Sequence, residues 1–468
     1  MRSSLFSLGA ALFAATAVIA QDGQADCSLT KKCPESAPCC SQYGKCGVGA
    51  YCLGGCDPRM SHSLESCVPA PVCQSRKIKM DNTDRIVDVS KYLGDADAAD
   101  FMSQGETVVR NGNVLLTMPK NSVGTVLAST TYMWYGSVKA RMKSSRGAGV
   151  ITGFILLSDV KDEIDYEWVG VDLETVQTNY YFQGITDYTQ SKNLTLTDTF
   201  STWHEYEIQW TPDKITWLIN GQVGRVKERK DTWNATSQQW LFPQTPARVQ
   251  LSLWPGGLPQ NPQGTIDWAG GVIDWDHEDI KKAGYYYASV SDVEIKCWDG
   301  KRGEPGSNSG TSYTYDDIRA TNDTVIDGDK KTVLASLQGT GEDMEKGKPS
   351  SSGSKTESVS PSATDDSGQQ MIPGGSNPGG SIPGSDSGSS DNTNTDSGAP
   401  NTVPGGGGGG STTNSDCNAR DFTQNEDSCG GSSGDAQGST DSPGAGSRTT
   451  AGASAFAALI AMAAVFLV

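Results

Sequence analysis

Histidine is scarce in this sequence of 468 residues, with only three in the chain: His62, His204 and His277. They are scattered, and the sequence offers no cluster of metal ligands with the usual spacing. We therefore expect neither a metal ion nor a cofactor, and any chemistry has to come from the protein's own side chains.

Basic residues are also few. Lys and Arg total 37 against 55 Asp and Glu, which gives a formal net charge of -18. A protein that binds nucleic acid needs a basic face to replace the counterions of the phosphates. The composition therefore argues against a nucleic-acid partner.

Long apolar runs are missing except at the two ends of the chain. The first 20 residues, MRSSLFSLGAALFAATAVIA, combine one early Arg with an apolar run and a final small residue, and a polar stretch follows at once. This pattern is typical of a secretory signal. Residues 1–20 are predicted to be cleaved off and the protein to be secreted.

The last residues, AGASAFAALIAMAAVFLV, are apolar to the end and follow the small and polar stretch SPGAGSRTT. This order predicts a glycosylphosphatidylinositol (GPI) signal, with attachment at Gly444 and removal of residues 445–468. The run is barely of spanning length, so a retained membrane helix is the alternative. We expect a GPI anchor in the outer leaflet of the plasma membrane.

Aromatic residues are rare between positions 303 and 444, where Gly, Ser, Pro, Thr, Asn and Asp dominate. Such a segment cannot bury enough apolar surface to offset its conformational entropy, so we expect a disordered stalk. Three N-x-Thr acceptors in the chain predict glycosylation at the surface of a secreted protein, at Asn193, Asn234 and Asn322.

Cysteine is absent from 74 to 296, whereas nine of the 12 cysteines lie between Cys27 and Cys73. In a secreted chain this density predicts disulfides. If the first eight pair among themselves, Cys73 is left over and Cys297 is its natural partner, by parity alone. Cys417 and Cys429 could close a small loop in the stalk.

Helical periodicity is weak between residues 75 and 299. WHEYEIQW alternates apolar and polar residues as a strand does, and Asn220-Gly221 shortly after it is the dipeptide favoured at a two-residue hairpin turn. Further strands are expected at GSVKARMKS, VITGFILLS, TNYYFQG, ARVQLSLW and ASVSDVEIKCW. Residues 74–302 are therefore predicted to form an all-β sandwich of two antiparallel sheets.

The stretch DEIDYEWVG has four acids in six consecutive positions. As a strand it has two faces with alternating residues: Glu163, Asp165 and Glu167 on one, and Ile164, Tyr166 and Trp168 on the other. Asp162 falls with the packing residues at the start of the strand, so we leave it out of the chemistry.

Two carboxylates on one strand face suit glycosidic-bond cleavage, in which one attacks the anomeric carbon and the other protonates the leaving oxygen. The Cα atoms of Glu163 and Glu167 would be on the order of 13 Å apart. Inward-leaning side chains can close this to the roughly 5 Å of a retaining enzyme. Because three like charges cannot all ionise easily, at least one pKa should rise, as a general acid requires. A calcium loop and a solvated strand face are the alternatives.

The cysteine-rich stretch APCCSQYGKCGVGAYCLGGC, residues 37–56, resembles the hevein-type chitin-binding module, carbohydrate-binding module family 18. We assign this module to residues 21–73. In that family a Ser and three aromatics bind N-acetylglucosamine rings, and the resemblance implies Ser41, Tyr43 and Tyr51. Lys45 occupies the middle aromatic position, so a disulfide-knotted spacer that has lost useful binding is the alternative.

The E-x-D-x-E signature in DEIDYEW, together with WHEYEIQWTPDKITWLINGQ and GTIDWAGGVIDW, resembles glycoside hydrolase family 16 and, within it, the fungal Crh-type cell-wall transglycosylases. The resemblance covers residues 75–299 and implies a β-jelly roll with the acids on its concave sheet. It also implies that Glu163 is the nucleophile, that Glu167 is the general acid and then base, and that Asp165 orients and tunes the nucleophile.

Five further residues fall in segments that resemble the sugar-binding strands of this family: Asn179, Arg248, Trp254, Thr265 and Trp268. Trp254 precedes Pro-Gly-Gly and Trp268 precedes Ala-Gly-Gly, where strands end and a groove is often rimmed. Stacking of the two indoles on pyranose rings is therefore expected, with core packing as the alternative.

The resemblance implies transfer as the reaction: chitin is cut, the fragment is held on Glu163, and a hydroxyl of β-1,3- or β-1,6-glucan takes it. Such an enzyme cross-links chitin to glucan in the fungal cell wall. The alternatives are a hydrolytic endo-β-glucanase or chitinase, and a non-catalytic chitin-binding wall adhesin. We expect polysaccharides as partners, a monomer, and an extracellular location.

Overall fold

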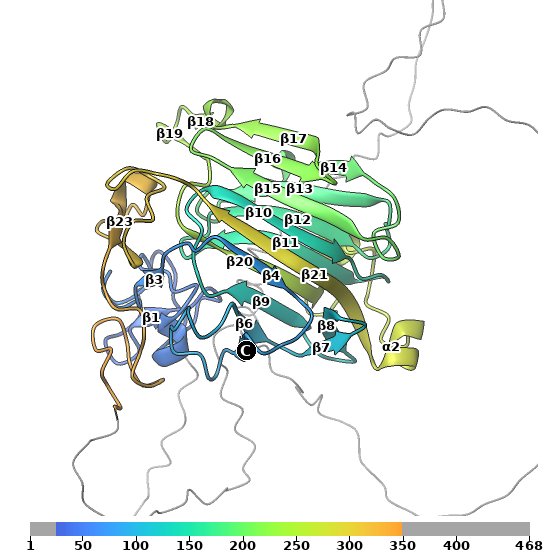
Figure 1. Cartoon of the computed structure of the whole chain (residues 1–468), viewed down its shortest axis with the longest axis horizontal. Coiled ribbons are helices and arrows are strands. Elements are labelled where there is room, and N and C mark those ends of the chain that lie inside the picture. Colours follow the sequence, from blue (N-terminus) through green and yellow to red (C-terminus); the bar gives the residue numbers. More distant parts are fainter. Residues whose placement is uncertain (1–24, 349–468) are drawn as a thin grey trace, which may run out of the picture.

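The computed structural model describes residues 25–348 (Figure 1). Several predicted features lie outside these residues: the signal peptide, the part of the predicted stalk after residue 348, Cys417, Cys429, and the GPI signal with Gly444. Within the described part, no helix is both long and apolar enough to cross a membrane.

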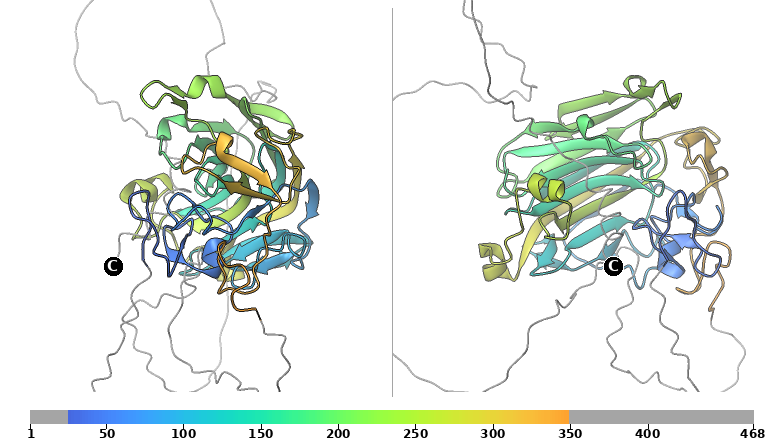
Figure 2. Two further views of the ribbon diagram at one scale, coloured as in Figure 1. Left: turned by 90° about the vertical axis from the view of Figure 1, so that its left-hand side faces the viewer. Right: turned by 180° about the vertical axis from the view of Figure 1, so that it is seen from behind.

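Two eight-stranded sheets pack face to face around one core (Figure 1, Figure 2). The β15 sheet has the order β17-β16-β15-β10-β21-β8-β7, and β4 also pairs with β21. Its strands are β4 (Arg76–Lys79), β7 (Thr107–Arg110), β8 (Asn113–Pro119), β10 (Gly136–Lys143), β15 (His204–Trp210), β16 (Lys214–Ile219), β17 (Gln222–Glu228) and β21 (Tyr285–Cys297).

The β12 sheet has the order β14-β13-β12-β11-β20-β9-β6-β5. Its strands are β5 (Ile86–Asp88), β6 (Phe101–Gln104), β9 (Thr125–Ser129), β11 (Val150–Ser158), β12 (Glu163–Val169), β13 (Thr175–Tyr181), β14 (Lys192–Thr195) and β20 (Ala247–Pro255). Neighbouring strands are antiparallel in this sheet except β5 and β6. The predicted all-β sandwich of two antiparallel sheets is confirmed.

The alternating segments of the sequence are the long strands of the structure. WHEYEIQW contains β15, DEIDYEWVG contains β12, and ARVQLSLW lies in β20. The hairpin between β16 and β17 turns at Asn220 and Gly221, whose φ values of 51° and 78° are the left-handed conformation that this tight turn requires. The strand and hairpin predictions are confirmed.

The apolar face of β12 anchors the strand in the core between the sheets. Tyr166 stacks on Phe154 with 6.0 Å between ring centroids, and Trp168 meets Tyr206 of the opposite sheet edge-on at 4.7 Å. From the same sheet Trp217 donates its indole N–H to the backbone oxygen of Asp165 at 3.0 Å. The β12 backbone is thus held from beneath, and its acidic face is fixed in direction.

Two short helices follow β20: α1 (Gln263–Trp268) and α2 (Glu278–Ala283). The expectation that Thr265 and Trp268 lie on a strand is wrong, because both belong to α1. Pro262 precedes the helix with φ already fixed at -53°, and Gly270 follows it at a φ of 82°. These two residues start and stop a single helical segment where the family resemblance had implied a strand.

The predicted start of the stalk at residue 303 is wrong, because residues 303–348 are folded. This C-terminal extension contains β22 (Ser312–Tyr315), the 3-10 helix η4 (Asn322–Thr324) and β23 (Val325–Gly328), and β22 also pairs with β3 (Ala70–Pro71). Tyr313 and Leu334 are buried. A few well-spaced apolar residues are enough to fold the segment onto the body, although its average composition indicates disorder.

The N-terminal module is held by disulfides. The first eight cysteines pair among themselves as Cys27–Cys40, Cys33–Cys46, Cys39–Cys52 and Cys56–Cys67, and Cys73 pairs with Cys297. Both parity predictions are confirmed. The module adds β1 (Cys39–Cys40), β2 (Cys46–Gly47) and the 3-10 helix η1 (Gly49–Cys52); the remaining short elements are η2 (Tyr188–Gln190), η3 (Arg229–Thr232), β18 (Trp233–Asn234) and β19 (Gln239–Trp240).

The Cys73–Cys297 disulfide closes a loop with a sequence separation of 224. Replacing both cysteines by Ala should lower the free energy of unfolding by about 3–5 kcal/mol, because the unfolded chain regains the entropy that the bond removes. Denaturant unfolding of parent and double variant, each under oxidising conditions, measures the difference. An unchanged unfolding midpoint and slope would contradict this role of the bond.

Candidate active site

The three acids of β12 point away from the core and are nevertheless buried. Directly paired residues on neighbouring strands share a face, so each acid belongs to a row that crosses the sheet. The row of Glu163 contains Tyr181 of β13, Leu157 of β11 and Arg248 of β20. The row of Asp165 contains Asn179, Ile155 and Gln250 of the same three strands. The row of Glu167 contains Gln177, Gly153 and Ser252. We call this side of the β12 sheet the acid face.

A glycine stands in the row of the third acid. Gly153 lies between Ser252 and Glu167, and a Cβ atom added there would lie 2.6 Å from the hydroxyl oxygen of Ser252. Any larger residue would push into the row. The side chain of Ser252 therefore packs over Gly153, next to Glu167 in the same row.

Burial raises the pKa of all three carboxyl groups, but nearby cations offset this unequally. Burial and the charge of Asp165 raise the pKa of Glu163, and the charge of Lys161 lowers it. The pKa of Glu163 remains well above its usual range. Burial raises the pKa of Asp165 to about 8, although the charge of Arg225 and a hydrogen bond from the backbone of Asn179 both lower it. For Glu167, burial, Asp165 and Glu163 all raise the pKa, and among the described residues no cation offsets them.

This inequality separates the roles of the acids. A proton shared by the cluster is held best where no cation favours the charged form, which is at Glu167. Glu163 has the ammonium group of Lys161 to favour its charged form. These surroundings are consistent with the expected roles of Glu167 as the acid and Glu163 as the nucleophile.

Asp162 has a different environment, although it is adjacent in sequence. Its carboxylate accepts the backbone N–H groups of Gln183, Gln244 and Thr245 at 2.9 to 3.0 Å, and the Thr245 hydroxyl at 2.7 Å. It joins the start of β12 to two loops. The sequence-based decision to leave Asp162 out of the chemistry agrees with this structural role.

The five expected sugar-binding residues surround the acid face. Asn179 shares the row of Asp165, and Arg248 shares that of Glu163. Trp268 donates its indole N–H at 2.9 Å to Gln177, which is in the row of Glu167, and the Trp254 and Trp268 rings lie 5.9 Å apart. Thr265 is on α1 beside them and is buried.

Several buried polar atoms here have no hydrogen-bond partner among the described residues. They are both carboxylate oxygens of Glu163 and of Glu167, Nε of Arg248, Nε1 of Trp254 and Oγ1 of Thr265. Native proteins leave few such groups unpaired, because each one costs free energy of desolvation. Their concentration on one face is consistent with a site that a polar ligand completes.

Two residues that the sequence analysis did not single out, Lys161 and Arg225, shape the site. Lys161 precedes β12 with a left-handed φ of 67°, which turns the chain into the strand. Arg225 comes from β17 in the other sheet, lies over Trp217 at 4.4 Å and donates to the Thr178 carbonyl at 2.8 Å. Burial lowers the pKa of Arg225 to about 10, partly offset by Asp165. A lysine two residues before the signature was a readable signal; Arg225 was not, because its approach depends on sheet packing.

The residues expected to bind chitin in the module are turned toward the rest of the chain. Ser41 and Tyr51 are buried. The Tyr43 hydroxyl donates to Gln104 of β6 at 3.2 Å. Lys45, at the middle aromatic position, forms an ion pair with Asp26. The module therefore does not present these side chains as an open binding surface.

The glycosylation acceptors differ in exposure. Asn193 is exposed on β14, and it continues the row of Gln177 and Glu167 on the acid face. Asn234 and Asn322 are half-buried, and Asn322 donates to the Tyr135 hydroxyl at 3.4 Å. Of the three, Asn193 is the most accessible to a glycosylating enzyme in the folded protein.

The chain is similar to known proteins over most of the described residues. The family model described as "Glycosyl hydrolases family 16" matches residues 95–270. "Crh-like protein 3" of Botryotinia fuckeliana (strain B05.10) is 63% identical over 323 residues, which cover 69% of this chain and 72% of that protein. "Crh-like protein 2" of Aspergillus fumigatus is 53% identical over 349 residues, covering 74% and 78%. The solved structure "Crh5 transglycosylase in complex with NAG" aligns at 29% identity and a TM-score of 0.46, over 58% of this chain and 98% of that one.

Substitutions of the neighbouring acids Asp162 and Glu163 should change the free energy of unfolding in opposite directions. Glu163→Gln replaces a buried, ionisable carboxyl group that has no hydrogen-bond partner among the described residues, and it should raise the free energy of unfolding at pH 7 by about 1 kcal/mol. Asp162→Ala orphans three buried N–H groups and should lower it by roughly 2–4 kcal/mol. Denaturant unfolding of both variants checks the signs. A destabilised Glu163→Gln variant would mean that this carboxylate is structural.

The raised pKa values also predict how stability depends on pH. An unfolded Asp loses its proton near its ordinary pKa of 3.8, whereas Asp165 holds it in the folded protein to about 8. Between these values the folded state binds more protons, so the free energy of unfolding falls as pH rises, by up to about 1.4 kcal/mol per pH unit for each proton.

Unfolding of parent and Asp165→Asn at pH 4, 6 and 8 measures this effect. The variant should lose less stability than the parent over the series. Parallel curves for the two proteins would show that Asp165 titrates normally.

Proposed function

We propose, since the chain belongs to the Crh-like proteins within glycosyl hydrolases family 16, that it is a retaining transglycosylase of the fungal cell wall. Its donor is chitin and its acceptor is β-1,3- or β-1,6-glucan. The observation that carries the proposal is the set of buried acids on one strand face, of which Glu163 has a cation beside it and Glu167 has none among the described residues.

In the first half of the reaction, an ionised Glu163 attacks the anomeric carbon of a donor sugar. The bond from that carbon to the bridging oxygen breaks, and Glu167 gives its proton to the leaving oxygen. The fragment is then an ester on Glu163, and Glu167 is a carboxylate. Lys161 favours the charged form of Glu163 that this attack requires.

In the second half, Glu167 takes a proton from the acceptor hydroxyl as that oxygen attacks the anomeric carbon. The ester bond to Glu163 breaks and both carboxyl groups return to their starting states. Asp165 stands between them on the strand face, and after burial its charge is the largest cause that raises the pKa of each glutamate.

Transfer rather than hydrolysis requires a bound acceptor sugar beside Glu167, the group that serves as base in the second half. The paired indoles of Trp254 and Trp268 suit this place, because Trp268 is fixed to Gln177 in the row of Glu167. Indole faces stack on the apolar faces of sugar rings, and a water molecule cannot make this contact. The two indoles therefore favour a sugar over water as the acceptor. We assign these residues to the acceptor.

The domain assignment follows from the same proposal. The module of residues 21–73 precedes the catalytic sandwich of residues 74–302, and we now extend the folded part to residue 348. We propose that the remaining stalk ends in a GPI anchor at Gly444, which would hold the enzyme at the outer face of the plasma membrane or in the wall. Its working partners are polysaccharides.

Hydrolysis by an endo-β-glucanase or chitinase is the second candidate, since the same acids serve water as acceptor. A wall adhesin is disfavoured, because binding alone gives no reason to bury three carboxylates together. Product analysis separates the three functions.

Incubation of the secreted protein with chitin oligosaccharides and a fluorescent β-glucan oligosaccharide should give fluorescent products larger than the acceptor. Glu163→Gln and Glu167→Gln should each lower this transfer at least about 1,000-fold, because each removes one half of the acid pair. Gln209→Glu, which changes one exposed side chain on β15, is the matched control and should transfer normally. Shortened chitin without fluorescent products would establish hydrolysis instead.

A further inference from the structure

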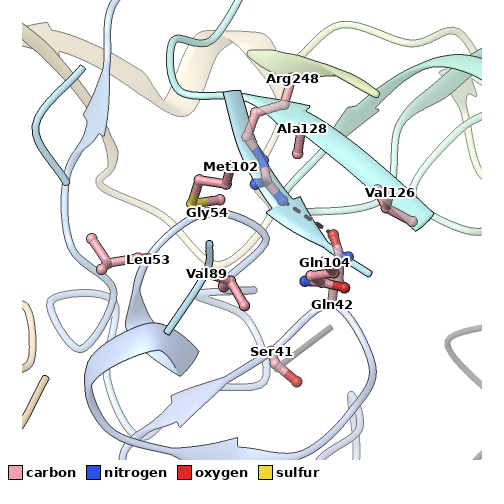
Figure 3. Close-up of a pocket in the computed structure, with 10 residues that line it drawn as sticks. All are labelled: Ser41, Gln42, Leu53, Gly54, Val89, Met102, Gln104, Val126, Ala128 and Arg248. Atoms are coloured by element: carbon pink, nitrogen blue, oxygen red, sulfur yellow. Dashed lines mark hydrogen bonds between the residues drawn. The ribbon is translucent and has the colours of Figure 1, made fainter. Parts of the chain in front are cut away.

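The N-terminal module is packed on the acid face itself. A small cavity at the junction is lined by module residues and by sheet residues of β6, β9 and β20 (Figure 3). The sheet residues are Met102, Gln104, Val126, Ala128 and Arg248. Strand register puts them on the acid face, since Ala128 and Met102 continue the row of Gln250, and Val126 and Gln104 continue that of Ser252.

Gln42 of the module is the centre of this junction. Its side-chain carbonyl accepts from Arg248 at 3.1 Å and from Gln250 at 3.4 Å, and its amide donates to the Tyr43 hydroxyl at 2.7 Å. Its backbone oxygen accepts from the ammonium group of Lys161 at 3.1 Å. One side chain of the module therefore contacts the rows of Glu163 and Asp165, and its backbone contacts the cation that acts on Glu163.

The junction is closed to a sugar. The cavity has a volume of about 10 Å³, which is roughly the space for one water molecule. A Cβ atom added at Gly54 would lie 2.5 Å from a guanidinium nitrogen of Arg248, so the module backbone approaches the sheet as closely as a glycine permits. A polysaccharide on the acid face cannot pass between module and sheet.

The module is also held there firmly. Asp159 accepts the backbone N–H of Gly55 at 2.8 Å, and Arg59 donates to the Val160 carbonyl at 2.8 Å. On the far side the C-terminal extension contacts it through Gly49, whose N–H donates to Gly339, and through Ser66, which donates to Glu342. Contacts on two sides make the docked module a fixed wall of the site.

We propose that the module is an end stop of the catalytic groove, with Gln42 as a positioning residue that fixes Arg248 and Gln250 at this end. The inference rests on the proposed function for its substrate class. Arg248 is two strands from Glu163 in the same row, about 10 Å away, so at most a short run of sugar rings can lie between the cleaved bond and the module. The residues by which related modules bind chitin serve here to close the groove.

The end stop limits how far a bound oligosaccharide extends beyond the cleaved bond on the module side. An end-labelled chitin oligosaccharide, cut by the secreted full-length protein, should therefore break at few positions. Gln42→Ala removes the acceptor for Arg248 and Gln250 and frees both side chains at this end of the groove, although the rest of the module stays docked. It should shift at least about one third of the cuts to bonds further from one end, and raise KM severalfold with less effect on kcat.

Gln42→Glu keeps an acceptor for both donors and should retain the parent cleavage pattern. Gln222→Ala, an exposed glutamine at the start of β17, is the matched control for the substitution itself. Thermal unfolding checks that each variant is folded. If Gln42→Ala does not fold, Tyr43→Phe removes only the hydroxyl that reaches Gln104, and it should shift the pattern in the same direction.

Cleavage at the parent positions by a folded Gln42→Ala protein would overturn the end stop and leave the proposed function intact. A parent protein that cuts β-glucan oligosaccharides but not chitin would overturn the proposed donor. The same comparison of cleavage positions on the glucan would then decide the end stop separately.

Discussion

Burial of three carboxyl groups on one strand is the constraint on which the rest of the site depends. Each charge there costs free energy of desolvation and repels its neighbours, so the cluster keeps at least one proton at neutral pH. Packing in the core of the sandwich offsets this cost by holding the other face of β12 in place. Tyr166 and Trp168 fix β12 in the core, and Trp217 holds the backbone of Asp165 from the opposite sheet. Without that packing the carboxyl groups would turn to solvent and titrate normally.

Because the cations are unevenly placed, the three acids of the cluster have different electrostatic surroundings. Lys161 acts on Glu163 and Arg225 on Asp165, whereas burial and the neighbouring acids raise the pKa of Glu167. The module also takes part in this arrangement, because the backbone oxygen of Gln42 receives the Lys161 ammonium group. A unit that looks like a separate sugar-binding domain in sequence is thus a supporting wall of the site in three dimensions.

Local patterns in the sequence were enough for the strands and for the division of DEIDYEWVG into two faces, because alternation and turn chemistry act over a few residues. Cysteine parity was enough for the disulfide between Cys73 and Cys297. The approach of Arg225, the docking of Gln42 and the folding of residues 303–348 depend on contacts between distant segments, which local patterns do not report. The helix at Thr265 was missed because the strand expected there came from the family resemblance, whereas Pro262 and Gly270 bound a short helix in this chain.

In the proposed reaction Glu163 carries the sugar between the two halves. Mass spectrometry can detect this intermediate in a Glu167→Gln variant mixed with a chitin oligosaccharide that has a good leaving group. That donor needs no acid for cleavage, and the variant lacks the base that releases the fragment. We expect a peptide containing Glu163 that is heavier by one transferred fragment. A donor that is consumed while the adduct forms on Asp165 or another residue, or forms on none, would contradict this role of Glu163.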